Sequence, residues 1–282
     1  MNKKVLKVFN LRGVSILDQL CFEELMLRTT ADNCVVVNTD IAKDSIVLGF
    51  SGKPLELLNI QKVKKDNLQV IRRFTGGGTV VVDHSTVFAS FVLNAGDVNS
   101  QPYPREIMKW TEEAVYAPAF ADLAETKGAD TEKFSLMEND YVWGDRKIGG
   151  NAQTITKNRW VHHTSFLWKF DPFRMGYLKL PSKRPAYRAD RPHLEFLTEI
   201  STHLPEHRRD PTEFAKALHR QMASLFELQN GLTGMECNDQ LPEAMLNEEF
   251  QELHARLKQE TPTFVPRTFV VDDLPDEPAV SV

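Results

Sequence analysis

The sequence predicts an α/β domain built on a mixed β-sheet. Short apolar runs of strand length alternate along the 282-residue chain with segments in which apolar residues recur at helical spacing. Two of the strand-like runs, Asp140–Trp143 and Arg146–Gly150, are separated only by Gly144 and Asp145, a pair typical of a hairpin turn. A hairpin joins antiparallel strands and a helical crossover joins parallel ones, so we expect both kinds of pairing.

Four segments of the first 230 residues are expected to be helical. They are Ser15–Arg28, Pro54–Lys65, a longer helix that begins with Pro104–Ala114, and a helix that begins at Asp210. In the first, Leu17, Leu20, Cys21 and Leu25 fall on one face, and the acidic Glu23 and Glu24 are expected elsewhere. Asp210 and Pro211 are typical of an N-cap and a first helical position.

Further apolar runs predict the strands between these helices. They are Cys34–Val37, Ser45–Phe50, Val70–Arg73, Thr79–Val82, Val87–Leu93 and Trp160–Phe170. After about residue 230 the chain becomes acidic, although apolar residues keep helical spacing from Leu246 to Leu257. We therefore expect one domain over residues 1–230, followed over residues 231–282 by an acidic helix and a loosely held, proline-containing tail.

The composition narrows the class of protein. Hydrophobic residues make up 41% and charged residues 26% of the chain, which is typical of a globular domain with an ordinary core. The net charge of −5 does not favour nucleic-acid binding. The three cysteines are far apart, which argues against a disulfide framework and a cysteine zinc site. With no membrane-length apolar run and no visible targeting segment, we expect a protein of the cytoplasm or an organellar matrix.

The segment Ile71–Asp83 predicts an anion-binding site. Arg72 and Arg73 end one apolar run, Gly76–Gly78 follow, and a second β-branched run begins at Thr79. A loop without side chains lets a ligand lie against the backbone, and the neighbouring guanidinium groups can neutralise a phosphate or carboxylate. The spacing is neither that of a P-loop nor that of a dinucleotide-binding loop. Taken alone, three glycines between strands are also compatible with a bulge or a flexible hairpin.

A second cluster follows about seventy residues later. Lys147 is followed by Ile148 and then by Gly149 and Gly150. A lysine beside bare backbone at a strand edge can direct its ammonium at a bound carboxylate or phosphate. Taken alone, the pattern is more often that of a surface lysine before a Gly-Gly turn, since exposed lysine is the default.

Together the motifs resemble the lipoate–protein ligase family. The matching features are Arg-Arg-Phe-Thr-Gly-Gly-Gly, Asn-Asp at 139–140, Asp-Arg-Lys-Ile-Gly-Gly-Asn-Ala at 145–152 and His-His at 162–163, within a resemblance that covers about residues 5–200. The resemblance implies a catalytic domain related to biotin ligases and class II aminoacyl-tRNA synthetases. It implies an acyl-adenylate made from ATP, with Mg²⁺, and lipoate or octanoate. A lysine of a lipoyl carrier domain then accepts the acyl group, with 2-oxoacid dehydrogenase E2 subunits and the glycine cleavage H protein as partners.

The resemblance also assigns roles to residues. Lys147 is implied as the catalytic residue. The resemblance implies that the nucleotide and adenylate are lined by Arg73, Gly78, Thr79, Val80 and Val81. It also implies that the acyl chain is bordered by Thr75, Gly76 and Gly77. Substrate or nucleotide binding is implied for Asn139, Asp140, Gly149, Gly150, Asn151 and His163. No protein residue is implied as a metal ligand.

Two segments depart from the family pattern. The family's His-Asp-x-Gly-Asn reads Val82-Asp83-His84-Ser85-Thr86 here, and its His-His-Gly-Thr reads His162-His163-Thr164-Ser165. The histidine pair is therefore also compatible with simple packing in a strand. The region beyond residue 230 is too short and acidic to match the separate accessory domain of larger bacterial ligases.

Several functions remain open at this stage. One is a transferase that accepts preformed lipoyl-AMP, and another is an acyltransferase that relays the acyl group through a cysteine. The chain has no cysteine between Cys34 and Cys237, which disfavours the relay. A biotin ligase is disfavoured because its Gly-Arg-Gly-Arg type loop is absent. A carrier-binding relative without catalysis is the remaining alternative.

A basic run extends from Lys179 to Arg191. It can be interpreted as a nucleic-acid patch, as a solvated loop, or as a loop that closes over the adenylate and attracts an acidic carrier. The sequence does not distinguish these interpretations.

Overall fold

The computed structural model describes residues 3–125, 133–180, 184–237 and 240–276. Within these ranges, eight strands form a large sheet in the order β11-β1-β2-β6-β10-β9-β8-β7. They are β1 (Val5–Leu11), β2 (Cys34–Asn38), β6 (Thr86–Asn94), β7 (Phe134–Met137), β8 (Asp140–Trp143), β9 (Arg146–Ile155), β10 (Arg159–Leu167) and β11 (Glu227–Asn230). β1 pairs in parallel with β2 and β11, whereas the other neighbours are antiparallel. The predicted α/β fold with a mixed sheet is confirmed.

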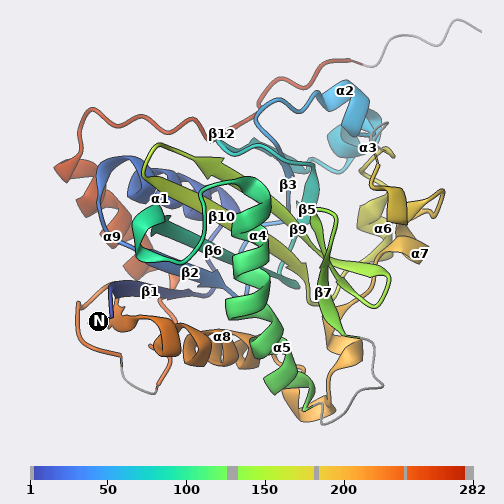
Figure 1. Cartoon of the computed structure of the whole chain (residues 1–282). Helices are drawn as coiled ribbons and strands as arrows, with labels where there is room; N and C mark the ends of the chain where they lie inside the picture. Colours follow the sequence, from blue (N-terminus) through green and yellow to red (C-terminus); the bar gives the residue numbers. More distant parts are fainter. Residues whose placement is uncertain (1–2, 126–132, 181–183, 238–239, 277–282) are drawn as a thin grey trace, which may run out of the picture.

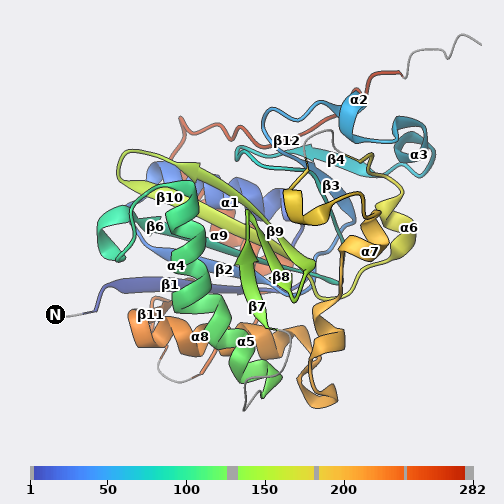
Figure 2. The same cartoon turned by 45° about the vertical axis from the view of Figure 1, so that its right-hand side comes forward.

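A smaller sheet carries the glycine segment. Its order is β12-β4-β3-β5, with β3 (Ser45–Leu48), β4 (Gln69–Arg72), β5 (Val80–Val82) and β12 (Phe269–Val270). Residues 73–79 connect β4 to β5 and form what we call the glycine loop. Figures 1 and 2 both place this sheet beside α2 (Pro54–Leu57) and α3 (Ile60–Lys65).

Helices cover both faces of the large sheet (Figures 1 and 2). On one face lie α1 (Ile16–Thr29) and α9 (Asn247–Glu260), and on the other lie α4 (Pro104–Thr111), α5 (Ala117–Ala124) and α8 (Pro211–Leu225). Strand alternation separates the two cores. In β1, Leu6 and Val8 join the core under α5 and α8, while Phe9 and Leu11 join the core under α1 and α9.

Short helices border the small sheet and the irregular segments. α6 (Pro172–Met175) and α7 (His193–Phe196) contribute Met175 and Phe196 to the core of the small sheet. The 3₁₀ turns are Ala95–Asp97, Ala186–Arg188, Ile200–His203 and Glu206–Arg208. A π-helical segment, Glu112–Tyr116, joins α4 to α5 just before Pro118, which has no amide to donate to the preceding turn. None of the helices within the described residues combines the length and apolar character that a bilayer span requires.

Most predicted elements are present, with shifted ends. Ser15 caps α1 by accepting from the Asp18 amide at 3.1 Å, and Asp210 caps α8 by accepting from the Thr212 amide at 2.8 Å. The single helix predicted over Pro54–Lys65 is wrong: it is divided into α2 and α3 because Asn59 caps a new helix start. The strand predicted to reach Phe170 ends at Leu167. β1, β7 and β11 were not predicted.

The first helix also corrects an expectation about its acidic residues. Glu23 and Glu24 were expected away from the buried face, but both are fully buried. Glu23 lies against the large sheet, where its carboxylate has hydrogen bonds with Ser90 and His163. Glu24 lies against the C-terminal segment and accepts a hydrogen bond from its backbone. Local periodicity assigns acids to solvent and does not register partners supplied by distant strands.

The C-terminal region contains the predicted helix, and part of the tail that was expected to be loosely held pairs with the small sheet. α9 forms over Asn247–Glu260, and Phe250 and Leu253 are buried against α1. Beyond it, β12 pairs with β4, so Phe269 and Val270 of the tail are part of the small sheet. Residues 277–282, which include the predicted end of the tail, lie outside the described residues.

Candidate active site

A cavity of about 480 Å³ lies between the two sheets. The small sheet contributes the glycine loop and β5, and the large sheet contributes β9 and β10. The segments around α6 and α7 close the remaining side. The cavity therefore brings together the two motif clusters that are about seventy residues apart in the sequence.

Arg73 organises the glycine loop. Its side chain is almost fully buried, and its Nη2 donates to the carbonyl oxygens of Gly76 and Gly78, both at 2.8 Å. Burial lowers the pKa of Arg73 to about 10, so the group remains cationic at neutral pH. Among the described residues, Arg73 has backbone carbonyls as partners and no carboxylate within ion-pair distance. Its charge is thus available to an anion in the cavity.

The loop requires glycine at position 77. Gly77 has φ of +99°, and a Cβ there would lie 2.8 Å from Arg73 Nη2 and 3.1 Å from the Asn151 carbonyl oxygen. A side chain at this position would therefore disturb Arg73 and β9 together. By contrast, a Cβ on Gly78 would meet no atom within 4 Å.

Lys147 enters the cavity from β9. Its Nζ lies 2.7 Å from Asp140 Oδ1, on the adjacent strand β8. The Tyr187 hydroxyl donates to Asp140 Oδ2 at 2.9 Å, and the Tyr187 amide donates to Glu138 Oε1 at 3.0 Å. The segment after residue 184 is thereby attached to the strand pair that carries Lys147. The ion pair sets the position of the ammonium at the cavity wall.

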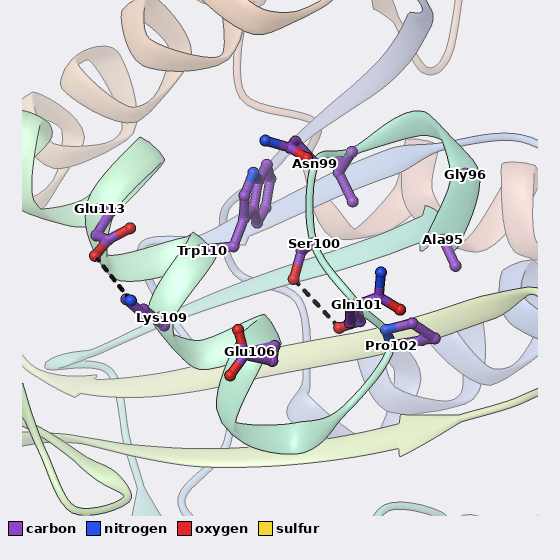
Figure 3. A pocket seen from close by; sticks show the side chains of 11 residues that line it. Ala95, Gly96, Asn99, Ser100, Gln101, Pro102, Glu106, Lys109, Trp110 and Glu113 are labelled. Carbon is purple, nitrogen blue, oxygen red and sulfur yellow. Dashed lines mark hydrogen bonds and ion pairs between the residues drawn. The ribbon is translucent and has the colours of Figure 1, made fainter.

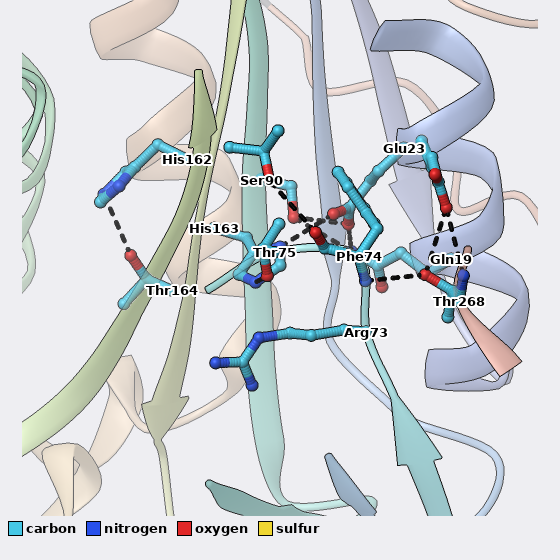
Figure 4. Close-up of polar contacts among 12 residues, drawn as sticks. Gln19, Glu23, Arg73, Phe74, Thr75, Ser90, His162, His163, Thr164 and Thr268 are labelled. Carbon is cyan, nitrogen blue, oxygen red and sulfur yellow. Dashed lines mark hydrogen bonds and ion pairs between the residues drawn. The ribbon is translucent and has the colours of Figure 1, made fainter. Parts of the chain in front are cut away.

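A buried polar chain supports the other side of the loop (Figure 4). His163 lies between Thr75 and Glu23, with its Nε2 3.2 Å from Thr75 Oγ1 and its Nδ1 3.0 Å from Glu23 Oε2. Ser90 donates to Glu23 Oε1 at 2.6 Å. Burial lowers the pKa of His163, although the adjacent carboxylate of Glu23 opposes that shift. The chain connects α1 to the glycine loop through the histidine.

The two adjacent histidines have different surroundings. Along β10 successive side chains point to opposite faces, so His162 lies on the other face of the sheet from His163. There it contacts Gln153, whose Nε2 is 2.9 Å from His162 Nδ1, and burial lowers its pKa to about 3. His162 is thus a neutral packed residue, whereas His163 lines the cavity.

The lining combines positive charge with an apolar wall. Its charged side chains are five cations and two carboxylates among the described residues: Arg73, Lys147, Lys179, Arg184, Arg188, Glu138 and Asp140. The apolar part is formed by Leu57, Val80, Val81, Phe88, Leu167, Met175, Leu178, Phe196 and Leu197. Such a surface suits a ligand with an anionic group joined to a hydrocarbon chain. Three basic residues of the run, Lys179, Arg184 and Arg188, belong to this lining, and Lys183 lies outside the described residues.

Most of the residues implied by the family resemblance meet at this cavity. Those in its lining are Arg73, Gly77, Gly78, Thr79, Val80, Val81, Asn139, Asp140, Lys147, Gly150, Asn151 and His163. Thr75 and Gly76 lie in the loop behind it, and Gly149 packs against Phe166. Sequence reasoning missed Phe88, Met175 and Phe196, because isolated apolar residues in unrelated segments carry no local signal for a binding wall.

A second hollow lies between residues 95–102 and helix α4 and its continuation (Figure 3). Its volume is about 530 Å³, similar to that of the cavity between the sheets. Its lysine, Lys109, is 3.8 Å from Glu113, and none of the motif residues lies there. We select the cavity between the sheets as the candidate active site because the motif residues converge there, and not because of its volume.

The described lining of the cavity contains neither a metal-binding cluster nor a thiol. Within the described residues, no group of three or more His, Cys, Asp or Glu side chains is arranged to hold a metal ion. The lining contains no cysteine among those residues. Cys21 and Cys34 are buried elsewhere in the fold.

Comparison with known proteins identifies the family. Residues 15–223 match the family model of the lipoyl protein ligase A/B catalytic domain, and the chain belongs to this family. The chain is 29% identical over 244 residues to "inactive lipoate–protein ligase 2" of Plasmodium falciparum (isolate 3D7). That alignment covers 77% of this chain and 62% of the Plasmodium protein, so the chain spans less than two thirds of its relative's length.

Solved structures agree in fold. A lipoate–protein ligase A bound with ATP has a TM-score of 0.63 and 18% identity, over 94% of this chain and 97% of that one. A bipartite lipoate protein ligase of Thermoplasma acidophilum, from a study with its E2 lipoyl domain, has a TM-score of 0.64 and 18% identity, over 92% and 93%. P. falciparum LipL1 in complex with lipoate has a TM-score of 0.61 and 17% identity, over 90% and 72%. At these identities the likeness establishes the fold.

Proposed function

We propose that the chain is a lipoate–protein ligase. It would activate lipoate or octanoate with ATP and transfer the acyl group to a lysine of a lipoyl carrier domain. The observation that supports this most directly is that Lys147, from the large sheet, shares one cavity with the glycine loop of the small sheet. The cationic groups suit the phosphate of an acyl-adenylate, and the apolar wall suits its hydrocarbon chain.

Two bond exchanges make up the proposed reaction. First, a carboxylate oxygen attacks the α-phosphorus of ATP, and the bond to pyrophosphate breaks. Next, the amine of the carrier lysine attacks the acyl carbon, forming an amide as the bond to AMP breaks and the amine loses a proton. Negative charge grows on oxygen in both transition states. Lys147 would stabilise that charge, since its ammonium lies in the cavity wall at a position set by Asp140.

Magnesium would accompany ATP rather than occupy a site built by the protein alone. Mg²⁺ in nucleotide sites uses phosphate oxygens, water and one or two carboxylates. Glu138 and Asp140 are the carboxylates of the described lining and would be the side chains available to such an ion. When bound, the ion would neutralise phosphate charge.

The carrier would be an acidic lipoyl domain, as in E2 subunits of 2-oxoacid dehydrogenases and in the glycine cleavage H protein. The exposed basic residues Lys179 and Arg184 border the cavity, where they can attract such a partner. The Thermoplasma ligase of similar fold, which was studied together with its E2 lipoyl domain, supports this choice of partner class.

A second candidate is a chain that accepts preformed lipoyl-AMP, or binds carriers without catalysis. We consider this second candidate because the Plasmodium relative is named an inactive ligase. The altered segment Asp83–Thr86 does not belong to the cavity lining, because Ser85 and Thr86 donate to Asp83 and close a local turn. In this chain none of its residues lines the cavity, whereas Ser165 of the other altered segment does.

The experiment separates activation from transfer. The purified chain is given ATP with lipoate, octanoate or biotin, and pyrophosphate release is measured; in parallel, transfer from lipoyl-AMP to an apo lipoyl domain is followed by mass spectrometry. We expect pyrophosphate release with lipoate or octanoate, and transfer. Transfer without activation would identify a lipoyltransferase. Failure of both reactions, with carrier binding retained, would identify a non-catalytic binder and overturn the proposal.

A further inference from the structure

The C-terminal segment contacts the backbone of the glycine loop. We call residues 261–276, which follow α9, the C-terminal strap. They lie beyond residues 15–223, the part of the chain that matches the family model. Figures 1 and 2 both show the strap leaving α9, passing α1 and reaching the small sheet at β12. The strap therefore links the far helix of the large sheet to the sheet that carries the loop.

A buried carboxylate anchors the middle of the strap. Glu24 of α1 is fully buried, and its Oε2 accepts from the amides of Arg267 at 2.8 Å and Thr268 at 3.2 Å. Its Oε1 accepts from Arg28 Nε at 2.9 Å. A buried carboxylate is costly unless such partners are present, so these bonds restrict where the strap can lie.

Strand pairing anchors the next residues. Phe269 pairs with Arg72 and Val270 with Ile71 in antiparallel register, and the Val271 amide donates to the Val70 carbonyl at 2.8 Å. β12 thereby covers the edge of β4. β4 is the strand that leads directly into Arg73 and the glycine loop.

Thr268 carries the contact from the strap to the loop. It is 3% exposed, and its Oγ1 accepts from the Phe74 amide at 3.2 Å (Figure 4). The Phe74 carbonyl accepts from Thr154 Oγ1 of β9 at 3.4 Å. The backbone of Phe74 is thus held from two sides, by the strap and by the large sheet.

Phe74 stands between two residues that shape the cavity. Arg73 bonds the loop carbonyls, and Thr75 contacts His163. The three glycines that follow have no side chains with which to fix the loop. The backbone of Phe74 therefore determines where the loop begins, and ordering it before a ligand arrives lowers the entropic cost of binding.

We propose that the C-terminal strap is a positioning element of the candidate active site, in which Thr268 sets the start of the glycine loop through the Phe74 amide. Its consequence for adenylate binding rests on the proposed function. Thr268 is a positioning residue, since it acts through Phe74 and does not belong to the cavity lining. The strap thereby gives residues outside the matched catalytic domain an effect on ligand affinity.

The test compares Thr268→Val with Thr268→Ser in the full chain. Valine retains the shape and removes the hydroxyl, which accepts from the Phe74 amide and also donates to Glu24 Oε2 at 3.5 Å, whereas serine retains the hydroxyl. Thr261→Val is the control, because Thr261 Oγ1 donates to Leu257 within the end of α9. Hydrogen exchange of the Phe74 and Thr75 amides measures how firmly the start of the glycine loop is held. Binding of lipoyl-sulfamoyl adenosine, a non-hydrolysable adenylate analogue, measures the affinity of the cavity for its ligand. We expect Thr268→Val to accelerate exchange at Phe74 and to raise the Kd about tenfold, as expected for loss of about 1.4 kcal/mol.

The serine variant and the control should resemble the wild type in both measurements. Unchanged exchange at Phe74 in Thr268→Val would overturn the proposal. Faster exchange with an unchanged Kd would also overturn it, because the strap would then be a structural cover without a role in positioning. If the wild-type chain does not bind the probe, the proposed function fails, while exchange at Phe74 still decides whether Thr268 holds the loop.

Discussion

Lys147 Nζ and Asp140 Oδ1 are 2.7 Å apart on neighbouring strands, and both side chains are partly covered, with exposed fractions of 24% and 13%. The pair places the ammonium in the wall of the cavity that the glycine loop of the other sheet also lines. Partial exposure leaves the lysine accessible to a ligand, while the carboxylate restricts its rotamers. Any chemistry that uses this lysine must therefore preserve or exchange its bond with Asp140.

Replacing Lys147 tests the centre of the proposed chemistry. Lys147→Ala should lower the rates of adenylate formation and acyl transfer about a hundredfold or more, since loss of one such electrostatic contact costs about 2.7–4 kcal/mol in the transition state. The measurements are pyrophosphate release and carrier acylation. Lys65→Ala, at an exposed position at the end of α3, is the matched control and should leave both rates unchanged. Near-normal rates in Lys147→Ala would exclude the lysine from the mechanism.

The glycine loop is best tested at Gly78. Gly77→Val would be uninformative, because φ is +99° there and the new side chain would meet Arg73. Gly78→Val fills open space at the cavity wall, so we expect a folded protein whose affinity for an acyl-adenylate analogue falls at least about tenfold, or about 1.4 kcal/mol. Calorimetric titration measures the affinity. Gly96→Val, also in open space but outside this cavity, should bind normally. Equal affinities in the two variants would make the loop a purely structural feature.

The cysteines should be dispensable. Burial raises the pKa of Cys21 to about 12 and also raises those of Cys34 and Cys237, so the thiols are protonated at neutral pH. We expect a variant with all three replaced by alanine to transfer the acyl group from lipoyl-AMP at a rate within about twofold of the wild type. Cys34 is fully buried, so unfolding is monitored in parallel. An octanoyl thioester donor that works only when one particular cysteine is present would establish a cysteine relay instead.

A buried histidine predicts how stability depends on pH. His254 is 1% exposed between Phe22 and Phe250, and its ring nitrogens have no hydrogen-bond partner among the described residues. Burial lowers its pKa to about 4, below the ordinary value of 6.5. Between these values the unfolded chain binds a proton that the folded chain does not. The free energy of unfolding therefore falls as the pH decreases from about 6.5 to 4, and this group contributes about 1–2 kcal/mol of loss between pH 7 and pH 5.

Urea unfolding of His254→Phe at pH 7, 6 and 5 measures this contribution. Phenylalanine suits the aromatic surroundings and cannot titrate, so the variant should lose less stability than the wild type over this interval. His84→Asn, at an exposed position, should keep the wild-type dependence. An unchanged dependence in His254→Phe would show that this histidine is not the group that titrates.

Local patterns in the sequence were sufficient to predict much of the fold. The mixed sheet, the helix α1, the capped start of α8 and the β8–β9 hairpin each depend on turn chemistry, capping or periodicity within a few residues. The motif segments around Gly76–Gly78 and Lys147 were likewise visible as sequence. These features are encoded locally, because the groups that stabilise them are near neighbours along the chain.

The tertiary structure determines which distant residues these local segments contact. Helical periodicity placed Glu23 and Glu24 in solvent, yet the fold buries both because His163 and the strap amides, distant in sequence, supply partners. The tail was expected to be loose because it is acidic and contains prolines, but its residues Phe269 and Val270 pair with β4. The convergence of Lys147 with the glycine loop likewise depends on how two separate sheets pack. Burial and hydrogen bonding across long sequence separations determine these contacts, and no local pattern contains that information.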